Sequence, residues 1–187
     1  DRKVMGSDLE EFANRAVSNI DSIIDKCIQL DQLDLNALAI HKAPFNFSEL
    51  LLSVISDTRL EEQFAILGED RIDIRSDRDI IRIIVSNLII NATKYSAPHE
   101  KIQICSSIDE NEDCRRLKFS IQNAIGPIGA PDPNLVFDKY YRGAGATKIS
   151  GSGLGLFLVR GLTHALAGDV KCQVNHDSIT FTVWIPI

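Results

Sequence analysis

A chain of 187 residues, 44% of them hydrophobic and 25% charged, has enough apolar material for one folded core and room for one appendage. Its formal net charge of −6 argues against nucleic acid or an anionic membrane as the main partner. We find no apolar run long enough to span a bilayer, and four dispersed cysteines without a C-x-x-C pair indicate free thiols rather than zinc ligands or disulfides.

The first predicted element is a long helix. Ser7-Asp8-Leu9-Glu10 fits a capping box with Ser7 as the N-cap. Apolar residues then recur at alternating intervals of four and three, which predicts a bundle helix that needs a partner: Leu9, Ala13, Ala16, Ile20, Ile23, Cys27 and Leu30. An ordinary amphipathic helix lying on its own domain is the alternative. We expect residues 1–43 to form this helix and a connector, and residues 44–187 to form a separate domain.

Residues 44–76 give weaker signals, namely a short strand at 45–47, a helix capped by Asn46 or Ser48, and a short strand at 72–74. The strongest prediction is the helix that follows, from Asp77 to Ser96, because its many apolar residues do not alternate as in a strand. One face of this helix is apolar and suited to packing on a sheet, and a second face, which includes Arg82, is expected in solvent.

The third face of this helix begins apolar and then becomes polar at Asn87, Asn91 and Lys94. A buried amide without a partner costs roughly 1–3 kcal/mol, so these side chains need one. Two amides and an ammonium in one row suit a phosphate and its Mg²⁺ ion. The alternative is that both asparagines bind neighbouring loops while Lys94 extends to water.

Two strands are predicted next, at 101–108 and 117–123, around the acidic turn 109–113. Residues 124–155 hold seven of the 11 glycines and three of the six prolines, which indicates a lid or binding loop. A helix at 152–167 and a hairpin of strands 170–174 and 178–185 complete the chain. This order predicts an α+β fold, a two-layer α/β sandwich whose mixed sheet is covered by helices on one face.

The segment G-S-G-L-G-L of residues 151–156 lies at a predicted helix start. Glycine allows the backbone to approach phosphates, and the first N–H groups of a helix attract anions. By itself this motif is weak, because a flexible loop end with a glycine-rich cap would have the same sequence.

Three segments together are far more specific. In their order and spacing, N-L-I-I-N-A-T-K-Y-S, F-D-K-Y-Y-R-G and G-S-G-L-G-L closely resemble the ATP-binding domain of sensor histidine kinases, within the superfamily that includes gyrase-type and Hsp90-type ATPases. The resemblance covers residues 45–187, and the first predicted helix resembles the second helix of the dimerisation and phosphotransfer hairpin. It implies ATP and Mg²⁺ as ligands, a homodimer in the full-length protein, a response regulator downstream, and a cytoplasmic location in a membrane-bound sensor.

The resemblance also implies the roles of individual residues. Asn91 would bind Mg²⁺, Arg142 would reach the γ-phosphate, and Phe137 would brace the lid. Arg142 could instead be a solvated charge, and Tyr95 could simply cover the helix end. Asn91 and Arg142 are the implied catalytic residues, and the implied ATP-binding set is Asn87, Asn91, Lys94, Tyr95, Asn123, Gly126, Phe137, Tyr141, Arg142, Gly151, Ser152, Gly153, Leu154 and Gly155.

Two positions depart from the pattern of the family or of its superfamily. Asn123 stands where the family has an Asp that accepts the adenine amino proton, and its amide oxygen can still accept one hydrogen bond. Asp132 is a rival adenine partner. Asn87 stands where the hydrolysing members of the superfamily carry a Glu, and an amide cannot take a proton from water, so we expect poor ATP hydrolysis.

None of the four histidines has the sequence context of the phosphoacceptor, which would therefore lie outside this chain: His41, His99, His164 and His176. The favoured interpretation is the ATP-binding catalytic portion of a sensor histidine kinase. A degenerate, non-catalytic module that pairs with another kinase is the first alternative, since Asn123 departs from the family. A Ser/Thr kinase of the same superfamily is the second.

Overall fold

The computed structural model describes residues 28, 38–111, 114–149 and 151–187 of the chain. Residues 39–187 form one compact unit that contains all the elements below. The predicted first helix lies, apart from Ile28, outside the described residues and stays a prediction. Among the described residues, no helix combines the length and the apolar character that crossing a membrane would require.

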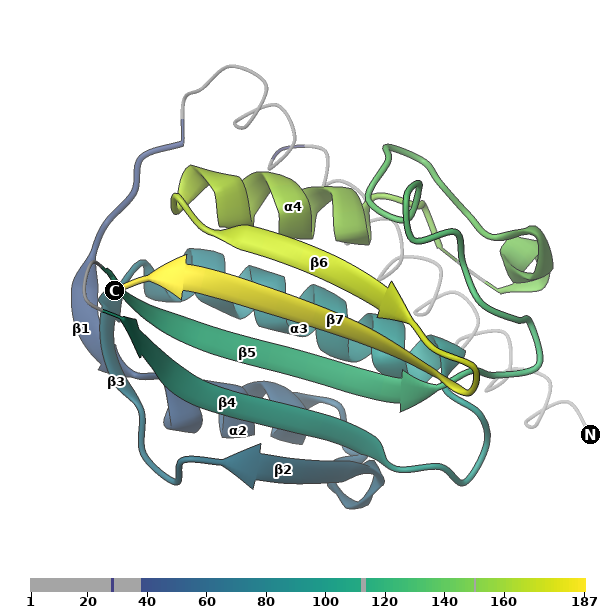
Figure 1. The fold of residues 1–187 in the computed structure, drawn as a ribbon, viewed down its shortest axis with the longest axis horizontal. Coiled ribbons are helices and arrows are strands. Elements are labelled where there is room, and N and C mark those ends of the chain that lie inside the picture. The colour runs from purple at the N-terminus through teal and green to yellow at the C-terminus, as the bar shows by residue number, and fades with distance from the viewer. Residues whose placement is uncertain (1–27, 29–37, 112–113, 150) are drawn as a thin grey trace, which may run out of the picture. The chain divides into compact units, whose positions relative to one another are not determined.

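The main sheet has five strands in the spatial order β2-β4-β5-β7-β6 (Figure 1). Strand β2 is parallel to β4, and the other neighbours are antiparallel, so the sheet is mixed. The strands are β2 (Phe64–Gly68), β4 (Ile102–Asn111), β5 (Cys114–Ala124), β6 (Asp169–Val174) and β7 (Ser178–Pro186).

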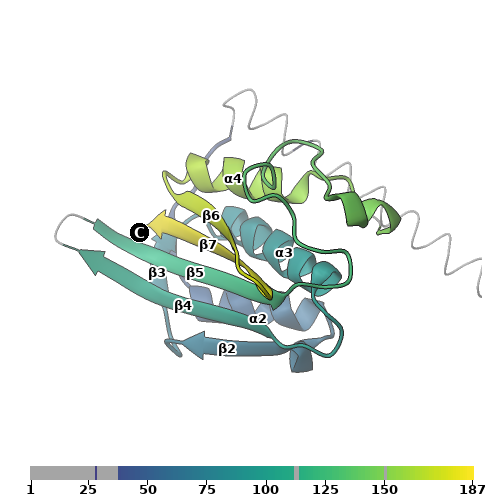
Figure 2. The ribbon, with the colours of Figure 1, turned by 45° about the vertical axis from the view of Figure 1, so that its right-hand side comes forward.

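The three helices lie on one face of this sheet, as the two views of the ribbon show (Figures 1 and 2). They are α2 (Phe47–Asp57), α3 (Arg78–Tyr95) and α4 (Gly155–Ala165), with two short 3₁₀ turns, η1 (Glu61–Gln63) and η2 (Ala144–Lys148). No described helix covers the opposite face. The predicted two-layer α+β architecture is confirmed for the described part of the chain.

The core lies between the helices and the sheet. Alternate residues of β5 are buried because successive side chains of a strand face opposite sides. Phe119 of β5 packs edge-to-face on Phe47 of α2, with ring centroids 5.6 Å apart. Helix α3 buries its predicted apolar face and part of the neighbouring stripe: Ile80, Ile81, Ile84, Val85, Leu88, Ile89 and Ala92.

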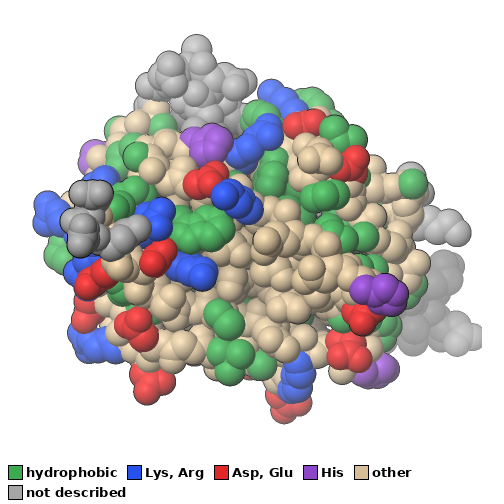
Figure 3. Space-filling model, viewed as in Figure 1, with side chains coloured by type: hydrophobic (Ala, Val, Ile, Leu, Met, Phe, Trp, Pro, Cys, Tyr) green, Lys and Arg blue, Asp and Glu red, His purple; other side chains and the backbone are tan. Residues whose placement is uncertain are grey.

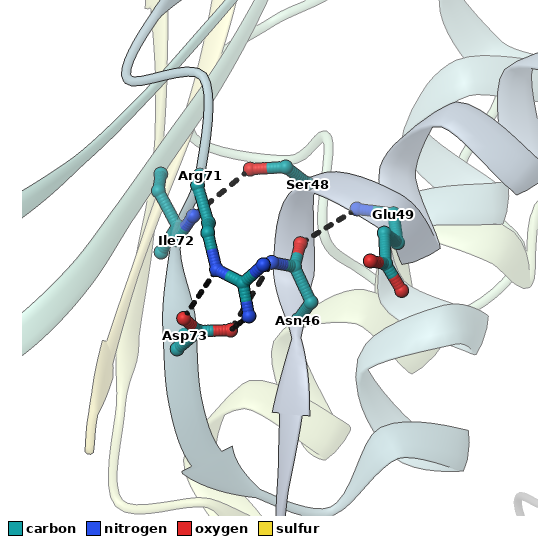
Figure 4. Close-up of polar contacts among 6 residues, drawn as sticks. All are labelled: Asn46, Ser48, Glu49, Arg71, Ile72 and Asp73. Atoms are coloured by element: carbon teal, nitrogen blue, oxygen red, sulfur yellow. Dashed lines mark hydrogen bonds and ion pairs between the residues drawn. The ribbon is translucent and has the colours of Figure 1, made fainter.

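A second sheet has two antiparallel strands, β1 (Ala43–Asn46) and β3 (Asp73–Ser76). It places the first residues of the domain beside the segment that precedes α3. Asn46 caps α2, because its side-chain oxygen accepts the N–H of Glu49 at 2.9 Å (Figure 4). Its amide nitrogen donates to Asp73, and Ser48 accepts the N–H of Ile72 at 3.1 Å. Asn46 is therefore the cap, and Ser48 instead connects α2 to the strand region.

Two details differ from the sequence predictions. Strand β2 was not predicted, because its five residues form a short apolar run without clear alternation. Arg82 does not simply face solvent: its guanidinium donates to Ser53 at 2.8 Å and pairs with Asp57 at 2.6 Å, both on α2. Arg82 therefore links α3 to α2.

Candidate functional site

Helix α3 carries the central row of the site, and its N-terminus is fixed by Asp77. One carboxylate oxygen of Asp77 accepts the N–H groups of Asp79 and Ile80 at 3.1 Å. The other oxygen accepts the N–H of His41, in the connector, at 2.7 Å. Asp77 is only 6% exposed, and its bond with the N–H of Ile80 is buried, whereas the other two bonds are partly buried. This side chain caps the helix and also ties the connector to it.

Asn87 lies where α3 meets the start of α4. Its amide nitrogen donates to the carbonyl of Ile83 at 2.9 Å. Its amide oxygen lies 2.9 Å from the point that a Cβ atom on Gly155 would occupy. Leu154, the N-cap of α4, makes no side-chain capping bond. The first N–H groups of α4 therefore remain available to an anion beside an oriented amide.

Lys94 and Tyr95 face the glycine-rich segment. A Cβ atom on Gly151 would lie 3.6 Å from the Lys94 ammonium and 3.9 Å from the Tyr95 hydroxyl. Burial lowers the pKa of Lys94 below its ordinary value, and the positive charge of Arg142 lowers that pKa further. The positive charges of Lys94 and Arg142 therefore act on each other, and a polyanion bound beside both would interact favourably with each.

Arg142 has a second role in this structure. Its guanidinium donates to the carbonyls of Ala146 and Ile149 and so holds the η2 turn of the lid. Its side chain is exposed rather than buried. The predicted contact of Arg142 with a γ-phosphate stays a prediction, and its charge already acts on Lys94.

The lid is held near its glycine-rich end by backbone contacts. Gly153 has a φ of +71°, and a Cβ atom there would lie 2.7 Å from the carbonyl carbon of Tyr140, so glycine is required. The N–H of Tyr140 donates to the carbonyl of Gly153 at 3.1 Å. Tyr140 itself has a φ of 67°, a conformation that the sequence did not reveal.

Two aromatic residues that the sequence singled out act within the lid. The Tyr141 hydroxyl accepts the N–H of Asp132 at 2.9 Å, so it joins two parts of the lid. Phe137 is buried and meets Phe181 of β7 edge-to-face, with ring centroids 6.1 Å apart. Phe137 therefore anchors the lid to the sheet. Its role in bracing the lid around ATP stays a prediction.

The start of the lid lies against the C-terminal end of α3. A Cβ atom on Gly126 would lie 2.6 Å from the Tyr95 carbonyl oxygen. Asn123 is 3% exposed, and its amide nitrogen donates to the carbonyl of Ala124 at 2.9 Å. Asp132, the rival adenine partner, is exposed and accepts the N–H of Asn134 at 2.8 Å, which closes a local turn.

The structure thus brings together six of the fourteen residues predicted for the site. Asn87 meets Gly155, Lys94 and Tyr95 meet Gly151, and Lys94 is near Arg142. Leu154 is buried in the core, whereas Asn91 and Ser152 are half-buried. In the described part of the chain, no group of three or more His, Cys, Asp or Glu side chains could hold a metal ion. The role of Asn91 as a Mg²⁺ ligand stays a prediction.

Known proteins resemble this chain in sequence. Residues 76–187 match the model of the family described as histidine kinase-, DNA gyrase B-, and HSP90-like ATPase. The sensor histidine kinase CusS of Escherichia coli O157:H7 is 27% identical over 98% of this chain and 37% of its own length. The sensor histidine kinase WalK of Bacillus subtilis (strain 168) is 35% identical over 57% of this chain and 18% of its own length.

Among solved structures, the histidine kinase AdeS of Acinetobacter baumannii superposes with a TM-score of 0.72. It is 20% identical, and the match covers 91% of this chain and 79% of that one. The likeness confirms the fold. The chain belongs to the family of histidine kinase-, DNA gyrase B- and HSP90-like ATPases, and its resemblance to sensor histidine kinases is confirmed. The match covers 37% of the length of CusS and 18% of the length of WalK, so this chain spans only part of the length of these two sensor kinases.

Proposed function

We propose that this chain is the ATP-binding catalytic portion of a two-component sensor histidine kinase. One observation supports this most directly: the Lys94 ammonium lies beside both the glycine-rich loop and the charge of Arg142. Burial disfavours a cation, so a site that keeps two of them together is suited to a highly charged anion. The triphosphate of ATP is such an anion.

The residues would act mainly by binding and positioning. The N–H groups at the start of α4 and the backbone of residues 151–155 would hold phosphate oxygens, and Lys94 and Tyr95 would contact the same groups. Arg142 would leave the carbonyls of the lid and stabilise the γ-phosphate as it is transferred. Phosphoryl transfer requires little covalent help from the protein, which fits a site made of amides, cations and backbone donors.

Asn91 would hold Mg²⁺ through its amide oxygen, and the ion would neutralise charge on the phosphates. The donor set fits this ion, because Mg²⁺ binds few protein oxygens and takes its other ligands from phosphates and water. Asn87 cannot act as a general base, since an amide does not accept a proton at neutral pH. We therefore expect hydrolysis of ATP by water to be slow.

The acceptor of the phosphoryl group would be a histidine on a helical hairpin outside this chain. We propose that residues 1–43 contribute the second helix of that hairpin and a connector, and that the full-length protein dimerises through it. A response regulator would receive the phosphoryl group next. The site would lie in the cytoplasm, where ATP is available, as part of a membrane-bound sensor.

The test is calorimetry of the chain with ATP, ADP and GTP, with and without Mg²⁺, followed by transfer to an added phosphotransfer hairpin. We expect Mg²⁺-dependent binding of ATP, and loss of both binding and transfer in Asn91→Ala. Thr93→Ala, two residues along the same helix, is the matched control and should behave as the unaltered chain. Absence of ATP binding at high micromolar ATP would instead support the non-catalytic pairing module.

A further inference from the structure

Strand β2 forms one edge of the main sheet, and it has exposed apolar side chains. Ile66 is 45% exposed and Leu67 is 51% exposed. Successive residues of a strand face opposite sides, so this edge offers one apolar side chain on each face of the sheet. The five residues of β2 contain no Pro and no charged residue, the common means by which proteins protect an exposed edge.

The backbone of β2 also has hydrogen-bonding groups that point away from the sheet. The N–H of Glu69 donates to the carbonyl of Ser106 in β4 at 3.3 Å, and the register pairs Gly68 with Ser106. Because this pattern alternates, Ala65 and Leu67 also direct their N–H groups to β4. The N–H and C=O groups of Ile66 therefore face the open side of the strand, whereas the N–H of Phe64 is already bonded to the carbonyl of Glu61.

Both ends of this strand are acidic. Residues 61–70 contain four carboxylates and no Lys, Arg or His: Glu61, Glu62, Glu69 and Asp70. No ion pair among the described residues uses any of the four. Figure 3 shows acidic side chains along the lower rim, where Figure 1 places β2. The ammonium of Lys101 donates to the backbone carbonyl of Glu62 rather than to a carboxylate.

This charge pattern determines which occupant fits. Antiparallel pairing with β2 of a second copy would place Glu61 and Glu62 opposite Glu69 and Asp70, so like charges would meet at both ends. An extended segment with apolar residues at its centre and Lys or Arg at its ends would face opposite charges instead. We propose that β2 binds a basic extended segment of a partner protein, which adds a strand to the sheet.

The test uses the whole chain and the end-blocked synthetic peptide KKVTVTVKK, with EEVTVTVEE as the charge-reversed control peptide. Binding is followed by fluorescence anisotropy of the labelled peptide at several salt concentrations. Amide hydrogen exchange by NMR then locates the contact. We expect the basic peptide to bind more weakly as salt rises, and to slow exchange of the Ile66 amide. The acidic peptide should not bind.

Two variants separate this contact from general charge attraction. Ile66→Pro removes an N–H that points away from β4, which an edge strand tolerates, and should weaken peptide binding about tenfold by the loss of one hydrogen bond. Glu61→Gln combined with Glu62→Gln should weaken binding and reduce its salt dependence without affecting folding. Glu110→Gln is the matched control, because this exposed carboxylate lies on β4 beyond the residues that pair with β2.

Equal binding of the two peptides would overturn the proposal. So would unchanged exchange at Ile66 in the presence of saturating peptide, because the peptide would then be attracted to the surface without forming a strand. The acidic residues would in that case only protect the edge from self-association. Thermal unfolding verifies that Ile66→Pro folds, and the double Glu→Gln variant tests the proposal independently if it does not.

Discussion

The side chain of Asn87 lies against Gly155, at the point where α3 meets the first turn of α4. The amide oxygen is 2.9 Å from the position of a Cβ atom on residue 155, while the amide nitrogen is bonded to the Ile83 carbonyl. The Asn87 amide can keep this orientation because residue 155 is a glycine, which has no Cβ atom to displace it.

Gly155→Ala should reduce ATP affinity without destabilising the fold. The new methyl group would displace the Asn87 amide, which can rotate away, and Ala is favoured over Gly in a helix by about 1 kcal/mol. We expect ATP binding about tenfold weaker, which corresponds to one lost or misdirected hydrogen bond. Calorimetry with ATP and thermal unfolding measure the two effects separately.

Gly143→Ala is the control for this substitution. Nothing lies within 4 Å of a Cβ atom at Gly143, in the lid, so both ATP affinity and stability should remain close to those of the unaltered chain. If Gly155→Ala binds ATP as well as Gly143→Ala does, the contact between Asn87 and residue 155 has no part in the site.

The elements that the sequence predicted best are those with local signals. Helix α3 begins at its expected cap, Asp77, because the capping side chain and the apolar pattern lie within the same stretch of sequence. Strand β2 was missed because its place in the sheet comes from parallel pairing with β4, nearly forty residues away in sequence. An apolar run as short as Phe64–Gly68 carries no such information.

The residues of the site also divide into those that the sequence could identify locally and those whose role depends on the folded lid. The sequence named Lys94 and Gly151 because their residue types suit phosphate, and the structure places them together. It did not reveal that Tyr140 has a positive φ or that Arg142 holds lid carbonyls. These features depend on how the lid folds back on itself, and no local pattern records that path.

The lowered pKa of Lys94 predicts a specific pH dependence of ATP binding. As pH rises through this pKa, Lys94 loses its charge, so ATP affinity should decline at a lower pH than for an ordinary lysine. Arg142→Gln removes one of the two causes of the lowered pKa and should move the onset of the decline to higher pH. Calorimetry across the alkaline range measures both curves. Lys94→Arg keeps its charge there, and an identical profile for this variant would contradict the prediction.

The lowered pKa of Lys94 also predicts the direction in which the free energy of unfolding changes with pH. Between the lowered pKa of the folded state and the ordinary pKa of the unfolded state, the unfolded chain holds a proton on Lys94 that the folded chain has lost. The contribution of Lys94 to the free energy of unfolding should therefore rise with pH in this window. Urea unfolding of the chain and of Lys94→Met across that window tests this, and a parallel pH dependence of the two would refute it.

Asp77→Ala should destabilise the domain, because it removes the cap of α3 and the acceptor for the His41 N–H together. Loss of an N-cap typically costs about 1–2 kcal/mol. Asp77→Asn keeps a capping oxygen and should cost less. Urea unfolding gives these values, with Asp79→Ala, an exposed residue in the first turn of the same helix, as the control. A cost for Asp77→Ala no larger than that for Asp79→Ala would show that the cap is unimportant.

Asn123→Asp should have opposite effects with and without nucleotide. In the free protein the new carboxylate is buried, cannot donate to the Ala124 carbonyl, and should lower the free energy of unfolding by about 1–3 kcal/mol. If residue 123 accepts the adenine amino proton, the carboxylate forms a stronger, charge-assisted bond with it. The rise in unfolding temperature on adding ATP should then be larger in Asn123→Asp than in the unaltered chain.

Asn123→Ala completes the comparison, since it removes the acceptor altogether and should show the smallest rise in unfolding temperature with ATP. The rise with GTP should not be larger in Asn123→Asp than in the unaltered chain, because guanine has an acceptor oxygen where adenine has its amino group. An equal rise with ATP in all three proteins would place the base away from residue 123, and adenine recognition would then belong to another part of the lid.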